Sequence, residues 1–141
     1  INNEKKINVI QEESNNKIKE NDKEYDKNNI INSKISVRGL NNIGATCYMN
    51  SVLQSFYHIS ELSNELIKLK NINERKMPMT SAYLEVINEL TFNKRNSISP
   101  TKFKMIITNN ELFEGIGAND SKALTLYILE TINEELNANN L

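Results

Sequence analysis

The side chain best suited to carry out a reaction in this chain is that of its one cysteine, Cys47. It follows a loop that contains Gly44. The apolar residues that come after it recur at helical intervals, which predicts a helix from about residue 47 to 58. A thiolate at the start of a helix faces unpaired backbone N–H groups and the positive end of the helix dipole, which stabilise the nucleophilic form of the sulfur. The position therefore predicts a nucleophilic cysteine. The alternative is a buried structural cysteine, the usual role of a single thiol.

Asn42 precedes the cysteine by five residues, in the same loop. A side-chain amide at this place can donate a hydrogen bond to a developing oxyanion, alongside the backbone N–H of Cys47. The alternative role for Asn42 is that of an ordinary turn asparagine, whose side chain bonds to nearby backbone.

A thiol nucleophile also needs a base that accepts its proton. His58 is the one histidine of the chain, and it lies eleven residues after Cys47 on the same predicted helix. At 1.5 Å per residue the two are roughly 16 Å apart along the helix axis, far beyond hydrogen-bond reach. We therefore expect no catalytic base in this chain, and we interpret His58 as a residue that pairs with carbonyls at the helix C-terminus.

The residues around the cysteine read GLNNIGATCYMNSVLQ from Gly39 to Gln54. This run resembles the cysteine box of the ubiquitin-specific proteases, G-L-x-N-x-G-[NA]-T-C-Y-[ML]-N-[SA]-x-[LI]-Q, and every patterned position is matched. The resemblance implies that Cys47 is the catalytic nucleophile and that Asn42 supplies the side-chain part of the oxyanion hole. Asn50 and Gln54 are expected to be structural and to bond the loop.

A second, weaker likeness lies further along the chain. The family's S-P-x-x-F segment corresponds to SPTKF at residues 99–103, and the first twelve positions of its F-x-G-x-x-Q-Q-D-[AS]-x-E-F-L segment correspond to FEGIGANDSKAL at residues 113–124. Asp120 and Ser121 fit this pattern. The departures are Ala118 and Asn119 for the glutamines, Ala123 for the glutamate and Leu124 for the phenylalanine. They call into question whether the surface beside the substrate channel is intact, because the family's segment lies near that channel.

The resemblance implies a fold and a domain organisation. Residues 37–141 would be the helical, thumb-like part of a papain-like α+β cysteine-protease domain, truncated before the palm, the fingers and the catalytic histidine. Residues 1–36 are rich in Asn, Lys and Glu without a sustained apolar period, so we expect a flexible, disordered leader. The implied function is thiol-dependent deubiquitination, with ubiquitin or ubiquitinated proteins as partners.

About five helices and no strand are predicted beyond the leader. Apolar residues at helical spacing, together with candidate cap residues, place them as follows: the helix that begins at Cys47, one capped by Ser60, one capped by Thr80, one that starts at Ser99–Pro100, and one from Asn119 or Asp120 to Leu136.

Composition restricts the classes of function. The 17 basic and 18 acidic residues nearly cancel, which speaks against nucleic acid or an anionic membrane as partner. One cysteine and one histidine give neither an internal disulfide nor a metal site, and we expect no cofactor. A reducing compartment, the cytoplasm or nucleus, is expected. Two alternatives remain: an inactive ubiquitin-binding or scaffold module of the same fold, and a plain helical interaction domain.

Overall fold

The computed structural model describes residues 38–115 and 117–139 of the chain. The predicted leader, residues 1–36, lies outside the described residues. The described elements, in chain order, are β1 (Gly39–Leu40), α3 (Cys47–Tyr57), α4 (Ser60–Ile67), α5 (Pro78–Phe92), β2 (Ser97–Ile98), α6 (Thr101–Ile107), a 3₁₀ turn (Glu111–Phe113) and α7 (Ser121–Ala138). The five α-helices of the described residues confirm the prediction of a mainly α fold.

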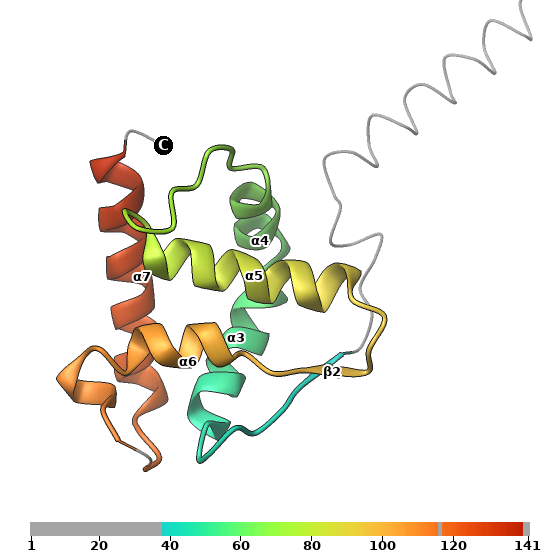
Figure 1. The fold of residues 1–141 in the computed structure, drawn as a ribbon, viewed down its shortest axis with the longest axis vertical. Coiled ribbons are helices and arrows are strands. Elements are labelled where there is room, and N and C mark those ends of the chain that lie inside the picture. Colours follow the sequence, from blue (N-terminus) through green and yellow to red (C-terminus); the bar gives the residue numbers. More distant parts are fainter. Residues whose placement is uncertain (1–37, 116, 140–141) are drawn as a thin grey trace, which may run out of the picture.

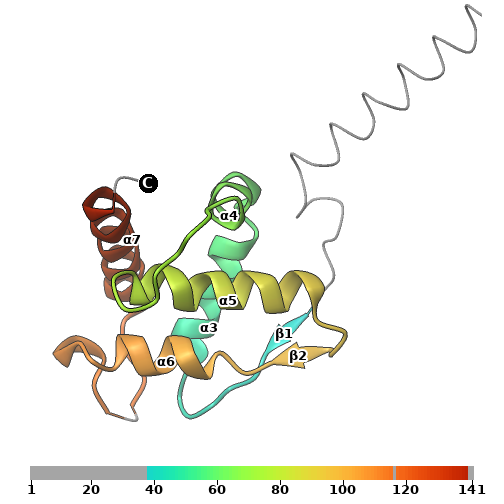
Figure 2. The same cartoon turned by 45° about the horizontal axis from the view of Figure 1, so that its top comes forward.

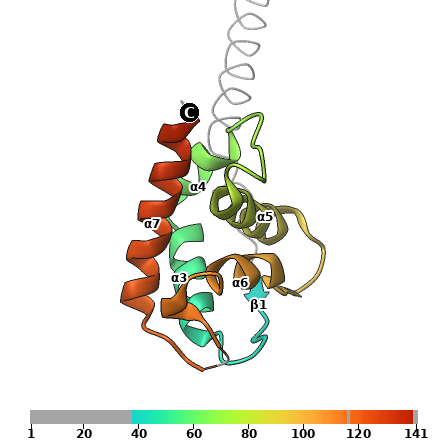
Figure 3. The same ribbon diagram turned by 60° about the vertical axis from the view of Figure 1, so that its left-hand side comes forward.

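Helix α5 lies at the centre of the packing. It contacts α4, α6 and α7, while α3 packs against α4 and α7. Figure 2 shows α5 above α6, with the two helices running side by side. Helix α7 stands along one side of the molecule in Figure 1, and Figure 3 shows it next to α3. Helix α3 is thus held by α7 on one flank and by α4 at its far end.

The core lies between these helices and is built from the apolar faces that the sequence spacing predicts. The ring of Tyr83 in α5 is fully buried and meets Phe56 of α3 and Phe103 of α6 edge to face, with ring centroids 6.2 and 6.4 Å apart. Leu124, Ile128 and, with a slightly larger exposed fraction, Ile132 supply the contribution of α7. Burial of these side chains fixes α3 relative to the other helices.

The predicted start of α5 is wrong. Thr80 does not cap this helix; the helix begins at Pro78, with Met77 as the cap residue. Proline suits this first position because its missing N–H would have no helical partner. The side chain that satisfies the helix start is the buried carboxylate of Glu135 in α7, which accepts hydrogen bonds from the N–H groups of Met79 and Thr80 at 2.9 and 2.8 Å.

Two other predicted helix starts also shift. Ser60 is the first residue of α4 and not its cap, a place taken by Ile59, and the Ser60 hydroxyl donates to Glu61. Helix α6 begins at Thr101, with Pro100 as its cap residue. Helix α7 begins where the sequence predicts, because the Asp120 carboxylate accepts from the N–H of Lys122 at 2.8 Å.

The expectation of no strand is wrong as well. Strands β1 and β2 pair in parallel, Gly39 with Ser97 and Leu40 with Ile98. A strand of two residues has no alternating pattern, so its pairing depends wholly on a segment 58 residues away. No helix of the described part of the chain has the length and apolar character needed to cross a membrane.

Candidate active site

Cys47 is the first residue of α3, and its side chain is exposed. The alternative of a buried structural cysteine is therefore wrong. The cap residue, Thr46, makes no side-chain capping bond to this helix, and the N–H of Cys47 bonds to none of the described residues. The sulfur thus stands beside free backbone donors at the positive end of the helix dipole.

The loop before the cysteine is fastened to α3 by two amide side chains. Asn50 Nδ2 donates to the carbonyls of Leu40 and Asn41 at 3.3 and 3.1 Å, and Gln54 Nε2 donates to the carbonyl of Arg38 at 2.9 Å. This confirms the structural roles expected for Asn50 and Gln54. The side chains that follow Cys47 on α3 therefore hold the chain that precedes it.

The start of the same loop is tied to α5 and β2. The guanidinium of Arg38 donates to the carbonyls of Leu90 and Thr91 at the C-terminal end of α5, where a cation also complements the helix dipole. The N–H of Asn41 extends the strand pairing by donating to the carbonyl of Ile98 at 2.8 Å. These contacts join the loop to elements more than fifty residues away.

The tip of the loop has two successive residues with left-handed backbone. Gly44 has φ 104° and Ala45 has φ 45°. Glycine adopts such angles freely, but alanine pays a steric cost because its Cβ approaches the following carbonyl. The chain reverses here, and after Thr46 it enters α3 at Cys47, whose side chain is exposed.

Asn42 lies across this turn, and its side-chain oxygen is occupied. Asn42 Oδ1 accepts from the N–H of Thr46 at 2.9 Å and from the hydroxyl of Thr46 at 3.1 Å. A backbone N–H can only donate, so the oxygen of the amide must face Thr46. The Nδ2 group forms no hydrogen bond with a described residue and remains available as a donor.

Tyr48, next to the cysteine, links α3 to the loop before α7. Its ring is buried, and its hydroxyl accepts from Asn119 Nδ2 at 3.2 Å and from Lys104 Nζ at 3.5 Å. Asn119 stands where the family pattern has a glutamine, yet its amide bonds to the side chain of Tyr48, the residue after Cys47. Asn119 and the glutamine of the family pattern both carry a side-chain amide, and this shared group could have predicted the contact.

The family model described as "Ubiquitin carboxyl-terminal hydrolase" matches residues 38–141 of the chain. The chain belongs to this family. The match begins at the residue before β1 and covers every described element, which confirms the resemblance to the ubiquitin-specific proteases.

Similar curated proteins carry the same family name. "Probable ubiquitin carboxyl-terminal hydrolase 1" of Schizosaccharomyces pombe is 33% identical over 123 residues, which cover 79% of this chain and 14% of that protein. "Probable ubiquitin carboxyl-terminal hydrolase 4" of the same yeast is 32% identical, over 72% of this chain and 19% of the relative. "Ubiquitin carboxyl-terminal hydrolase 16" of Danio rerio is 30% identical, over 72% of this chain and 15% of the relative. The chain thus spans less than a fifth of the length of each.

His58 lies at the opposite end of α3 from Cys47. His58 is the C-cap residue of that helix, and its Nδ1 lies 2.7 Å from the carbonyl oxygen of Gln54. The eleven-residue separation corresponds to roughly 16 Å along a helix axis. The ring thus pairs with a carbonyl in the last turn, as the sequence predicts, and does not reach the sulfur.

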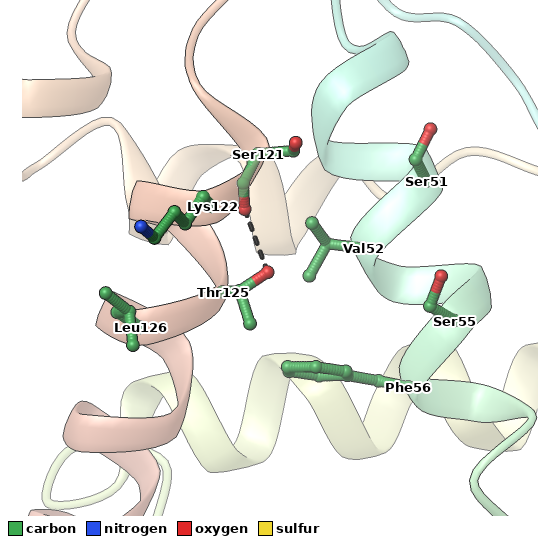
Figure 4. Close-up of a pocket in the computed structure, with 8 residues that line it drawn as sticks. All are labelled: Ser51, Val52, Ser55, Phe56, Ser121, Lys122, Thr125 and Leu126. Atoms are coloured by element: carbon green, nitrogen blue, oxygen red, sulfur yellow. Dashed lines mark hydrogen bonds between the residues drawn. The ribbon is translucent and has the colours of Figure 1, made fainter.

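A shallow groove of about 390 Å³ lies between α3 and α7 in this member of the family (Figure 4). Four residues come from each helix: Ser51, Val52, Ser55 and Phe56 from α3, and Ser121, Lys122, Thr125 and Leu126 from α7. Ser51 and Ser55 follow Cys47 at intervals of four, so all three lie on one exposed helix face.

Within residues 38–115 and 117–139, no three His, Cys, Asp or Glu side chains are grouped so that they could hold a metal ion.

Proposed function

We propose that this chain supplies the nucleophile and part of the oxyanion hole of a cysteine-type deubiquitinase. The reaction is hydrolysis of the isopeptide or peptide bond at the C-terminus of ubiquitin, and the partners are ubiquitin and ubiquitinated proteins. The observation that carries the proposal is the exposed Cys47 at the start of α3, together with an Asn42 amide that is bonded to Thr46, the residue before Cys47, and whose Nδ2 group bonds to none of the described residues. The family to which the chain belongs supplies the substrate class.

In this mechanism the Cys47 thiolate attacks the carbonyl carbon of the last ubiquitin residue. The electron pair of the C=O bond moves to the oxygen, which is held by the Cys47 N–H and by Asn42 Nδ2. Collapse of this tetrahedral intermediate breaks the C–N bond, and the leaving amine takes up a proton. Water then hydrolyses the thioester, releases the ubiquitin carboxylate and restores the thiolate.

The proton that leaves the thiol and reaches the amine must pass through a base outside the described residues. The nearest imidazole along the chain, His58, is occupied at the far end of α3. We therefore propose that the 141-residue chain alone does not hydrolyse ubiquitin conjugates. The thiol must remain reduced, so the proposed setting is a reducing compartment, the cytoplasm or the nucleus.

The test uses the full-length protein and a ubiquitin probe with an electrophile at its C-terminus. We expect covalent labelling that mass spectrometry maps to Cys47, and loss of both labelling and chain cleavage in Cys47→Ala. Ser55→Ala, on the same exposed face of α3, is the matched control and should label normally. Asn42→Ala should retain ubiquitin binding and lower kcat by ~10²–10³, the usual effect of removing one oxyanion donor.

The same experiment separates the proposal from its main competitor. The second candidate is a ubiquitin-binding module without activity, which is favoured by the departures from the family's second segment at residues 118, 119, 123 and 124. A full-length protein that binds ubiquitin but is never labelled at Cys47 would establish that module. Cleavage by the isolated 141-residue chain would contradict our assignment of the base to other residues.

A further inference from the structure

We infer that Thr46 is a positioning residue that holds the Asn42 amide with its donor group toward the reacting carbonyl. The inference rests on the proposed function, because it concerns the same oxyanion hole. It adds a residue whose hydroxyl bonds to the Asn42 side chain and to the N–H of Ile43. Thr46 is fully buried under the loop, whereas Asn42 is exposed.

The hydrogen bonds around the Thr46 hydroxyl leave one arrangement of its proton. The N–H of Ile43 donates to Thr46 Oγ1 at 3.1 Å, so one lone pair of the hydroxyl oxygen is occupied. The hydroxyl proton then points to Asn42 Oδ1, 3.1 Å away. The same oxygen receives the Thr46 N–H at 2.9 Å. Two donors from one buried residue therefore fix a single acceptor.

The orientation matters because the two ends of an amide have opposite polarity. With Oδ1 held by Thr46, the Nδ2 group bonds to none of the described residues and can donate to an oxyanion. If the amide turned over, its oxygen would face the developing negative charge and repel it. The Asn42 side chain is exposed, so packing alone does not prevent this rotation. Thr46 prevents it with two hydrogen bonds.

A double-mutant cycle in the full-length protein tests the inference. Thr46→Val keeps the shape and the backbone N–H but removes the hydroxyl, and we expect kcat to fall about tenfold with KM unchanged. Thr46→Ser restores the hydroxyl and should recover most of the rate. In an Asn42→Ala background, Thr46→Val should lower kcat no further, because the group through which it acts is absent.

Thr80→Val is the matched control. Thr80 is also fully buried, and its hydroxyl also donates to a side-chain oxygen, that of Glu135 at 2.6 Å. Its loss should lower the melting temperature without changing kcat at a temperature where the protein is folded. A fall in kcat for Thr80→Val equal to that for Thr46→Val would show a general effect of stability and would overturn the inference.

A second measurement does not depend on turnover. In the 141-residue chain, the ¹⁵N order parameter of the Asn42 side-chain amide should fall in Thr46→Val and remain unchanged in Thr80→Val. Equal order in both variants would overturn the inference. Activity separates the two proposals: without Cys47-dependent turnover the proposed function fails, and the positioning role of Thr46 in catalysis fails with it. An active enzyme in which Thr46→Val equals wild type overturns only the role of Thr46.

Discussion

The carboxylate of Glu135 caps helix α5 at Thr80, whose backbone N–H and hydroxyl donate to Oε2 at 2.8 and 2.6 Å. The other oxygen, Oε1, accepts from the N–H of Met79. Helix α7 thus satisfies the start of α5 from 55 residues away, with a negative charge at the positive end of the dipole. Helix α7 also packs against α3, so it contacts both of these helices.

Replacing Glu135 should strongly destabilise the chain. Glu135→Ala leaves two backbone N–H groups and the Thr80 hydroxyl buried without an acceptor, so we expect a loss of about 3 kcal/mol in the free energy of unfolding. Urea unfolding of the 141-residue chain measures it. Glu134→Ala, at an exposed neighbouring position, should cost less than about 0.5 kcal/mol. Equal effects of the two variants would contradict a capping role for Glu135.

Tyr83→Phe should be neutral or stabilising by up to about 1 kcal/mol, because the Tyr83 hydroxyl is buried and has no hydrogen-bond partner among the described residues. Ser63 lies near it, but the Ser63 hydroxyl donates to the carbonyls of Phe56 and Tyr57 instead. Thermal unfolding at neutral pH measures the change. A loss of more than 1 kcal/mol in Tyr83→Phe would reveal a hydrogen bond at this hydroxyl.

The pH dependence of stability gives a second test at Tyr83. Burial raises the pKa of the Tyr83 phenol, an effect that the nearby Ser63 hydroxyl only partly offsets. Above pH about 10, the ordinary tyrosine pKa, the unfolded chain releases the phenolic proton while the folded chain retains it. The free energy of unfolding therefore falls as pH rises above 10. We expect Tyr83→Phe to reduce this alkaline loss; an identical alkaline loss in both proteins would exclude Tyr83 as a source.

Ala45 should tolerate asparagine and reject valine. At φ 45° a β-branched side chain is strained, so Ala45→Val should cost about 1–2 kcal/mol. Ala45→Asn should be neutral or slightly stabilising, since asparagine adopts left-handed backbone more readily. Thermal unfolding and the rate of Cys47 labelling in the full-length protein check both changes. If valine were tolerated as well as asparagine, the left-handed turn could not be required.

Asn119→Ala should loosen the contact between α3 and the loop before α7. The change leaves Tyr48 with Lys104 as its remaining polar partner, at 3.5 Å, and should cost about 1 kcal/mol. Asn119→Gln retains an amide and should keep most of the stability. Ala118→Gln, at the neighbouring exposed position, is the control. The free energy of unfolding of each variant measures these effects. An Asn119→Ala protein as stable as wild type would show that the bond to Tyr48 contributes nothing to stability.

Much of the site could be predicted from the sequence because its determinants are local. The cysteine box from Gly39 to Gln54 identified the family, and the apolar spacing after Cys47 predicted the helix that carries it. The distance between Cys47 and His58 followed from helix geometry alone. The Asp120 cap was also predictable, since its acceptor and the N–H of Lys122 are two residues apart.

The remaining relationships were decided by the tertiary structure. The cap of α5 by Glu135, the pairing of β1 with β2 and the bond from Asn119 to Tyr48 each join residues more than fifty positions apart. Sequence spacing encodes which face of a helix is apolar, but it does not encode which distant polar group will meet a helix end once those faces are buried. The amide of Asn42 shows both contributions. The sequence determines that an amide is present, whereas the tertiary structure determines its orientation, because the folded loop brings the two donors of Thr46 to its oxygen.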